Sequence, residues 1–372
     1  MNKKTLSLAF VSTLLASLFF VSFVRATVGP VEFVTTIALD VEPNCIAVNE
    51  ETNQVYVGTE TGLLVIDCTT DMVVTEILPD ADVRTITFNL QTNRIYVSDY
   101  PNGIVVIDST TKQQVGEISE HAYSSEAIAI NPVTNLIYIQ DQAVFEGQYD
   151  CLAVYNGETN TLMTRVNMPG SNTHDYVENV HVTVNPETNR IYATWSGDNS
   201  LHVIDGDTNS ILKTVSPSSF RYGVVKVNPY TNYVYVGNVA LDGDTLEEVF
   251  SDYEGDLEAV DPVNNLLYTI GQYYNLTDHS SKYYLWVLNG TTHDVITSYE
   301  LESLDWISHR NDHLGVNCNN GKVYIVNRDE TEIPVVVIPE LSSRILISTF
   351  IIATLAVVIY GKTAKKGKVS SD

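Results

Sequence analysis

The phrase NPETNRIYA at residues 185–193 has seven variants along the chain. They begin at Asn49, Asn89, Asn131, Asn185, Asn228, Asp261 and Asn317. Each contains a tyrosine seven positions after its first residue, and successive tyrosines stand 40, 42, 54, 43, 33 and 56 residues apart. The flanking residues alternate in hydrophobicity as strands do, and spacings of about 40 to 50 residues are typical of β-propeller blades. The repeat therefore predicts an all-β fold with seven blades.

Each part of the phrase suits a tight hairpin turn. An Asn or Asp opens the turn by bonding its own backbone, and a following Pro presets φ. The fifth position holds Asn in six copies and Gly321 in the seventh. These two residue types adopt positive φ at the lowest cost. We therefore expect a positive φ at every fifth position.

A second phrase follows each copy and completes a blade of four strands, named a to d from the propeller axis outward. It reads Val65-Ile66-Asp67 in the first blade and Val337-Ile338-Pro339 in the last. In blade five, Gly237-Asn238 joins strands b and c directly. Blade seven has no d strand of its own, whereas VEFVTTIAL at residues 31–39 matches a d strand and precedes the first copy. We expect it to close the ring, because closure removes an open sheet edge.

Both ends of the chain lie outside the predicted propeller of residues 27–339. Residues 1–26 have two lysines, an apolar stretch and small final residues, as a signal peptide does. Ile345 to Tyr360 is an uncharged run that spans about 24 Å as a helix, and lysines follow it, which favours a cytoplasmic tail. Residues 340–372 are therefore predicted to anchor an extracellular propeller in the plasma membrane. A buried terminal helix is the alternative.

The chain is acidic, with a formal net charge of −26. Residues 1–26 and 340–372 each contribute +3, which leaves −32 on residues 27–339. Such a charge repels phosphate backbones and excludes nucleic acid as a partner. The cysteines Cys45, Cys68, Cys151 and Cys318 form no CxxC motif, so neither a zinc ribbon nor a c-type haem is expected. We expect no cofactor, although a divalent cation stays open.

The two phrases resemble those of the YVTN-repeat propellers, exported and surface-layer proteins whose signature reads like NPxTNxVYV followed by VID. The resemblance covers roughly residues 31–338 and implies a surface or binding role without a shared catalytic set. The tail from Ile338 to Lys366 is similar to the PEF-type sorting signals of archaeal surface proteins, with Leu341 where Phe is usual.

The strand order predicts two different propeller faces. Both tight turns of a blade share one face, which should look toward the membrane, and the d–a and b–c loops share the other. Long d–a loops bring aromatic, Arg and other polar residues to that outer face, a composition typical of binding anchors. The candidates are Arg84, His121, Tyr123, Glu126, His174, Asp175, Tyr176, Glu178, Arg221, Tyr222, Trp306, His309, Arg310, Asp312 and His313.

Three sharper patterns have alternative interpretations. His309 and His313, with Asp312 beside them, could reach one metal from a helical turn. Asp252, Glu254, Asp256 and Glu258 alternate and could hold calcium on one strand face, or form a solvated acidic edge. Asn275-Leu-Thr277 and Asn289-Gly-Thr291 match the glycosylation acceptor pattern.

The sequence favours a cell-surface module for binding, adhesion or scaffolding, with a protein or glycan of the cell envelope as its partner, rather than an enzyme. Two other classes stay open. A metal-dependent hydrolase or lactonase would use residues at the tops of the inner strands, namely Asn44, Arg84, Glu126, Asn179, Asp256 and Asp312. A structural envelope component would use lateral contacts alone.

Overall fold

The structure is a computed structural model of the whole chain. It describes residues 29–119, 127–141, 151–168, 180–195, 199–218, 224–251, 253–274, 281–301, 313–326 and 330–339. Residues 30–338 form one compact unit. The predicted signal peptide and the apolar run of residues 345–360 lie outside the described residues, among which no helix is long and apolar enough to cross a membrane.

The unit of residues 30–338 consists of seven antiparallel sheets with four strands each, as predicted. The a strands are β2 (Pro43–Asn49), β6 (Val83–Asn89), β10 (Ile128–Asn131), β14 (His181–Asn185), β18 (Val225–Asn228), β22 (Asp256–Asp261) and β26 (Leu314–Asn317). The b strands are β3 (Gln54–Thr59), β7 (Arg94–Asp99), β11 (Leu136–Asp141), β15 (Arg190–Trp195), β19 (Tyr233–Val236), β23 (Leu266–Tyr274) and β27 (Lys322–Ile325).

The other two strands complete each blade. The c strands are β4 (Leu63–Asp67), β8 (Gly103–Asp108), β12 (Cys151–Asn156), β16 (Ser200–Asp205), β20 (Val239–Asp242), β24 (Ser281–Asn289) and β28 (Glu332–Val337). The d strands are β5 (Met72–Ile77), β9 (Gln114–Ile118), β13 (Leu162–Asn167), β17 (Ile211–Val215), β21 (Glu248–Ser251), β25 (Val295–Leu301) and β1 (Glu32–Ala38).

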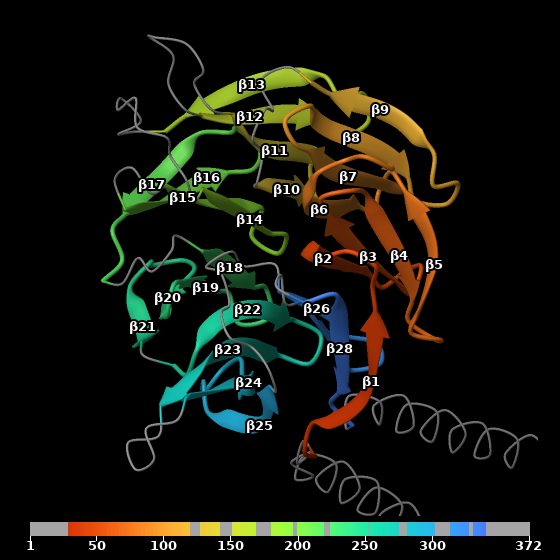
Figure 1. The fold of residues 1–372 in the computed structure, drawn as a ribbon. Coiled ribbons are helices and arrows are strands. Elements are labelled where there is room, and N and C mark those ends of the chain that lie inside the picture. Colours follow the sequence, from red (N-terminus) through yellow and green to blue (C-terminus); the bar gives the residue numbers. More distant parts are fainter. Residues whose placement is uncertain are drawn as a thin grey trace, which may run out of the picture. The chain divides into compact units, whose positions relative to one another are not determined.

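The blades form a closed ring. Each a strand contacts the a strands of both neighbouring blades, and β26 of blade 7 contacts β2 of blade 1 (Figure 1). Apolar side chains of adjacent blades pack together, for example Tyr96 and Ile104 of blade 2 with Ile128 and Ile137 of blade 3. The hydrophobic core is therefore a set of layers between blades, which no single blade could bury alone.

Blade 7 is closed by the N-terminal strand, as the sequence predicts. β1 pairs with β28 in antiparallel register, with Glu32 opposite Val337 and Ile37 opposite Ile333. The b–c connection of blade 5 is also as predicted, because a turn at Gly237 and Asn238 joins β19 directly to β20. The second phrase of blade 7 was assigned two residues too late. Tyr324 pairs with Val335 as Tyr56 pairs with Val65, so Val335-Val336-Val337 takes the place of Val65-Ile66-Asp67.

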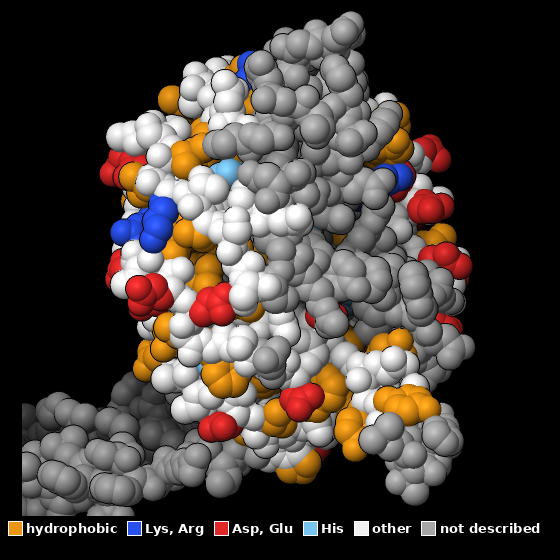
Figure 2. Space-filling model, turned by 90° about the vertical axis from the view of Figure 1, so that its left-hand side faces the viewer, with side chains coloured by type: hydrophobic (Ala, Val, Ile, Leu, Met, Phe, Trp, Pro, Cys, Tyr) orange, Lys and Arg blue, Asp and Glu red, His pale blue; other side chains and the backbone are white. Residues whose placement is uncertain are grey.

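The d strands form the rim of the propeller and expose apolar side chains on every blade. These side chains are Phe33, Val34, Met72, Val73, Val74, Val115, Met163, Leu212, Val249, Phe250 and Val295. Figure 2 views the rim from the side on which β17 and β21 lie in Figure 1, and shows hydrophobic side chains scattered between acidic ones. Charges beside exposed apolar residues discourage pairing of sheet edges between molecules.

The a–b turns have the backbone conformation that the repeat predicts. The fifth position has a φ between 52° and 58° in the six Asn copies, and 72° at Gly321. The opening residue accepts a backbone hydrogen bond in its own turn, as when Asn49 Oδ1 accepts from the amides of Glu51 and Thr52 at 3.1 Å each. Positive φ also occurs at a second site, the last residue of the c–d turn, in Asp71, Lys112, Asn160, Asn209, Leu246 and His293.

The repeated asparagines also join neighbouring blades. At five junctions the opening Asn donates through Nδ2 to Oδ1 of the fifth-position Asn in the next blade. The pairs are Asn89–Asn135 at 2.7 Å, Asn131–Asn189 at 2.7 Å, Asn185–Asn232 at 2.9 Å, Asn228–Asn265 at 2.7 Å and Asn317–Asn53 at 3.0 Å. At the junction of blades 6 and 7, Asp261 and Gly321 occupy these positions, and Asp261 accepts from Nδ2 of Asn264 instead, at 2.7 Å.

The repeated tyrosines form a second set of contacts between blades. All seven are buried. Six have hydroxyl contacts with the next blade around its c–d turn, in the pairs Tyr56–Lys112, Tyr96–Asn160, Tyr138–Asn209, Tyr192–Gly243, Tyr235–Gly290 and Tyr324–Asp71. The hydroxyl of Tyr268 has no partner among the described residues. Its neighbour is blade 7, where β28 ends without a c–d turn because the d strand comes from the N-terminus.

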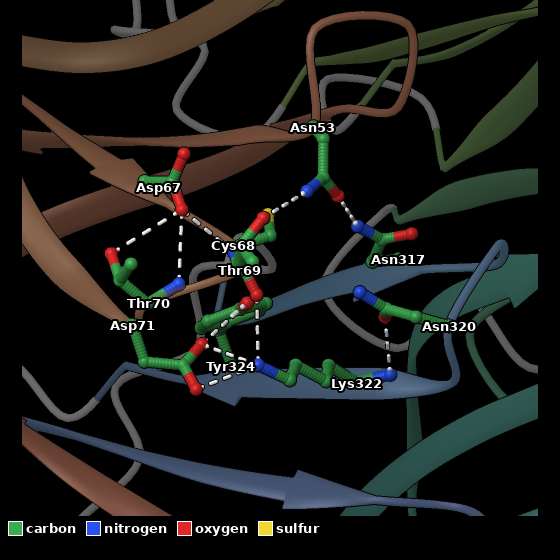
Figure 3. A network of polar contacts seen from close by, with 10 residues as sticks. All are labelled: Asn53, Asp67, Cys68, Thr69, Thr70, Asp71, Asn317, Asn320, Lys322 and Tyr324. Carbon is green, nitrogen blue, oxygen red and sulfur yellow. Dashed lines mark hydrogen bonds and ion pairs between the residues drawn. The ribbon is translucent and has the colours of Figure 1, made fainter.

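The seam between blades 7 and 1 combines these contacts with an ion pair (Figure 3). Lys322 Nζ lies 2.6 Å from Asp71 Oδ2 and also donates to the carbonyl of Cys68 at 2.8 Å. Tyr324 donates to the same Asp71 carboxylate at 3.1 Å. Both charged side chains are mostly buried, at 17% and 10% exposure. The two ends of the propeller are therefore fastened on the tight-turn face by groups more than 250 residues apart in sequence.

Candidate binding face

The face opposite the tight turns is formed by the b–c and d–a connections and by the first residues of the a strands. Most of the predicted binding residues lie in d–a connections outside the described residues. These are His121, Tyr123, Glu126, His174, Asp175, Tyr176, Glu178, Arg221, Tyr222, Trp306, His309, Arg310 and Asp312. The channel candidate Asn179 and the glycosylation candidate Asn275, which lies in a b–c connection, are also outside the described residues. Arg84 and His313 lie within the described residues, and each belongs to a separate cluster of side chains.

Arg84 lies in a cluster at blades 1 and 2. Its Nη2 lies 2.9 Å from Asp82 Oδ2, and its guanidinium carbon lies 3.8 Å from the ring centroid of Tyr100. Asn44 of the preceding blade donates to the other oxygen of Asp82 at 3.5 Å. The side chains of Arg84 and Asp82 are partly exposed, and Tyr100 is exposed. A stacked and ion-paired Arg loses little conformational freedom when a ligand binds, which suits an anchor.

A second cluster contains His181 of β14 and Lys226 of β18, on the a strands of blades 4 and 5. Burial, with a smaller contribution from the charge of Lys226, lowers the pKa of His181 to about 4. The imidazole is therefore neutral at pH 7, with Lys226 as the cation of this cluster. Neither residue was among the predicted site residues, because the repeat phrase gives no signal at the start of these strands.

The third cluster joins blades 6 and 7. His313 Nδ1 lies 3.3 Å from Glu258 Oε2, and both side chains are 4% exposed. His313 Nε2 is buried and has no hydrogen-bond partner among the described residues. Glu258 occupies a β-bulge between Leu257 and Ala259, and bulges commonly redirect a side chain. The pair resembles the outer half of a carboxylate–histidine–metal arrangement, in which the carboxylate orients the ring.

The alternation of carboxylates expected along one strand at residues 252–258 is not found in the described part, and Asp252 lies outside it. Gly255 has a φ of 75° and lies before β22, which begins only at Asp256. The bulge then turns Glu258 into the interior, where it meets His313. The carboxylates of Glu254, Asp256 and Glu258 therefore do not alternate along one strand. Among the described residues, no three His, Cys, Asp or Glu side chains gather as a metal site.

Asn289, the other glycosylation candidate, opens the c–d turn of blade 6. Its Oδ1 accepts from the amides of Thr291 and Thr292 at 2.8 and 3.0 Å. Asp205 and Asp242 have the same role in blades 4 and 5, for example with Thr208 and Thr245 at 2.8 Å. Turn formation alone thus accounts for the Asn-Gly-Thr sequence.

Blade 6 adds a feature that the sequence analysis missed. β23 and β24 have nine residues each, whereas β19 and β20 of blade 5 have four each. Besides the repeated Tyr268, the long hairpin carries five large aromatic residues, of which Tyr273 is 58% exposed. These are Tyr273, Tyr274, Tyr283, Tyr284 and Trp286. The aromatic runs QYY and KYYLW on either side of a short gap were the available signal.

The comparisons with known proteins add no identification. No model of a known protein family matches the chain. A search of curated proteins also finds no match. The YVTN resemblance therefore stays an interpretation of the repeated phrases, and the fold is established by the structure.

Proposed function

We propose that the chain is an exported cell-surface propeller, anchored in the plasma membrane by residues 340–372, that binds a protein or glycan of the cell envelope through its b–c and d–a face. The support is a contrast between the two faces. On the tight-turn face, the repeated Asn and Tyr side chains are used in contacts between blades. On the other face, the starts of the a strands differ from blade to blade and include the Arg84, Lys226 and Glu258 clusters. Variation on a constant scaffold is typical of a binding surface.

The test compares binding of the purified full chain to whole cells or envelope fractions with that of two variants. The face variant carries Tyr176, Trp306 and Arg310 changed to Ala. The rim variant carries Met72, Leu212 and Val295 changed to Ser. Thermal melting accompanies each measurement, because surface substitutions away from special sites shift stability by about 0.5 kcal/mol or less, whereas loss of anchors can cost a complex about 2 kcal/mol or more. Lost binding with unchanged melting in the face variant alone supports the proposal, and retained binding in it overturns the proposal.

One observation favours a second candidate, a structural component of the envelope. Every d strand exposes at least one large apolar side chain on the rim, where lateral contacts between neighbouring molecules would form. Binding lost only in the rim variant would favour this role. The hydrolase or lactonase hypothesis requires a bound divalent metal, and metal analysis of the purified full chain tests it directly.

A further inference from the structure

The long hairpin of blade 6 carries an aromatic surface on the side that faces blade 5. In an antiparallel pair, directly opposed residues share a side. Tyr273 lies opposite Lys282, Gly271 opposite Tyr284, and Thr269 opposite Trp286. Trp286 packs against the core cluster that includes Tyr235 and Ala240 of blade 5. The alternating residues Lys282, Tyr284 and Trp286 therefore face blade 5, whereas Tyr283 faces the other way.

Blade 5 is too short to cover this surface with its own hairpin. Its chain turns at Gly237, two residues after the repeated Tyr235. In blade 6 the strand continues for six residues beyond the repeated Tyr268, to Tyr274. The positions of blade 5 that would lie opposite the outer part of the hairpin do not exist. The difference in length leaves a step whose wall is the aromatic face of blade 6.

The rings in this wall are held in place by their surroundings. Tyr273 and Tyr284 lie 6.3 Å apart in a T-shaped arrangement, and Tyr284 and Trp286 lie 5.7 Å apart. A β-carbon at Gly255 or Gly271 would come 3.0 Å from Cζ3 of Trp286, so the indole rests against backbone that only glycine leaves free. Such packing orients the ring before any ligand arrives, which lowers the entropy lost on binding.

Polar groups edge the aromatic wall without giving it a net charge. Lys282 Nζ lies 2.6 Å from Glu300 Oε1, and Tyr284 donates to the other oxygen of Glu300 at 3.3 Å. Lys282 and Glu300 are both about half exposed. The wall thus offers ring faces, a hydroxyl, an ammonium and a carboxylate, while its two charges compensate each other.

We propose that this wall, formed by Tyr273, Tyr284 and Trp286 with Lys282 and Glu300, binds a neutral oligosaccharide. The C–H groups of a pyranose are attracted to the negative face of an aromatic ring, and its hydroxyls both donate and accept hydrogen bonds at the edge. A compensated ion pair gives no preference for a charged ligand, and the acidic chain, with a net charge of −26, disfavours an anionic one. The inference rests on the proposed binding function and names its ligand class and its place.

The test measures binding of mannotetraose, cellotetraose and chitotetraose to the purified full chain by calorimetry and tryptophan fluorescence. Tetragalacturonate is the anionic control. The variants are Tyr284→Ala and the exposed Tyr273→Ala, and the matched control is Tyr283→Ala, which removes the neighbouring ring on the opposite side. We expect one neutral tetrasaccharide to bind, with affinity reduced about tenfold or more in Tyr273→Ala and Tyr284→Ala and unchanged in Tyr283→Ala.

Three results would overturn the inference: no neutral tetrasaccharide bound at millimolar concentration, equal binding by all variants, or a preference for tetragalacturonate. Envelope binding separates this failure from that of the proposed function. Suppose that the wild type still binds envelopes after periodate has destroyed their glycans, and that Tyr284→Ala does not. The wall then binds a protein, and only the oligosaccharide inference fails. If the full chain binds no envelope fraction but binds a tetrasaccharide through Tyr284, the wall stands and the proposed cellular role fails.

Discussion

Tyr138 of blade 3 donates its hydroxyl to Oδ1 of Asn209 in blade 4, over 2.7 Å. Asn209 is the left-handed residue of its c–d turn, with a φ of 56°. The bond therefore links the core of one blade to the turn of the next. Tyr268 occupies the same position in blade 6, and its hydroxyl is buried without a partner among the described residues.

This difference predicts opposite outcomes for the same substitution. Tyr138→Phe should lower the free energy of unfolding by about 1 kcal/mol or more, because it removes a hydrogen bond and leaves the Asn209 oxygen without its donor. Tyr268→Phe should be neutral or stabilising, because no bond is lost and a buried polar group is removed. Denaturant unfolding of the full chain measures both. Equal losses in the two variants would contradict the assigned role of the hydroxyl.

Asn189 has several roles, which changes what the turn pattern alone predicts. Its φ is 52°, its Oδ1 accepts from Asn131 at 2.7 Å, and its Nδ2 donates to Asp207 at 2.9 Å. From the turn alone, Asn189→Gly should be near neutral. The contacts instead predict a loss of about 1 to 3 kcal/mol, because Asn131 loses its acceptor in a buried setting.

Asn189→Val should cost more than Asn189→Gly, by about 1 to 2 kcal/mol, because a β-branched residue is also strained at positive φ. Denaturant melts of both variants give the comparison. The control is Asn93→Gly, in blade 2, where the side chain has a described bond to Thr110 at 2.8 Å in its own blade. A neutral Asn189→Gly would show that the bond between blades contributes nothing to stability.

The number of blades could be predicted because the turn signal is local. Asn or Gly at the fifth position indicates a positive φ at that same residue, so seven copies of the phrase indicate seven turns. The second left-handed position gave no such signal. Residues as different as Leu246, His293 and Lys112 occupy it, so no residue type marks it. The register of blade 7 was misplaced because a run of valines aligns equally well two residues apart in an alternating strand.

The contacts between blades could not be read from single phrases, because they join different copies. One sign of these contacts was nevertheless visible in the sequence. Asp261, which opens the sixth copy, is the only Asp at the opening position, and Gly321, in the seventh copy, is the only Gly at the fifth position. These two positions form a junction, so the donor and acceptor are replaced together. The face of the b–c and d–a connections was predicted, but its described clusters were not, for a physical reason. Their side chains, such as Lys226 and Glu258, lie on strand starts and a bulge whose positions depend on each blade.

The seam ion pair predicts a large effect from one substitution. Lys322→Met should lower the free energy of unfolding by about 3 to 5 kcal/mol, because it leaves the mostly buried Asp71 carboxylate without its cation. The matched control is Lys282→Met, which breaks an ion pair that is about half exposed and should cost about 1 kcal/mol or less. Chemical unfolding of both variants checks the ratio. Similar losses would mean that the seam pair is solvated in solution.

His181 predicts a defined pH dependence of stability. Its pKa in the folded protein, about 4, lies below the ordinary value of 6.5. As the pH falls, the unfolded chain therefore takes up the proton before the folded protein does. The contribution of neutral His181 to the free energy of unfolding is complete above about pH 6.5 and is lost toward pH 4. His181→Gln removes this term. The wild type should lose about 2 kcal/mol relative to the variant over this range, allowing for the partial exposure of the ring. Unfolding curves at several pH values give the difference, in which the titration of other groups cancels.

Lys226→Gln should raise the lower end of the pH range over which this stability is lost, because the charge of Lys226 adds to the depression of the His181 pKa. A constant difference between wild type and His181→Gln from pH 6.5 to pH 4 would show that the imidazole titrates normally.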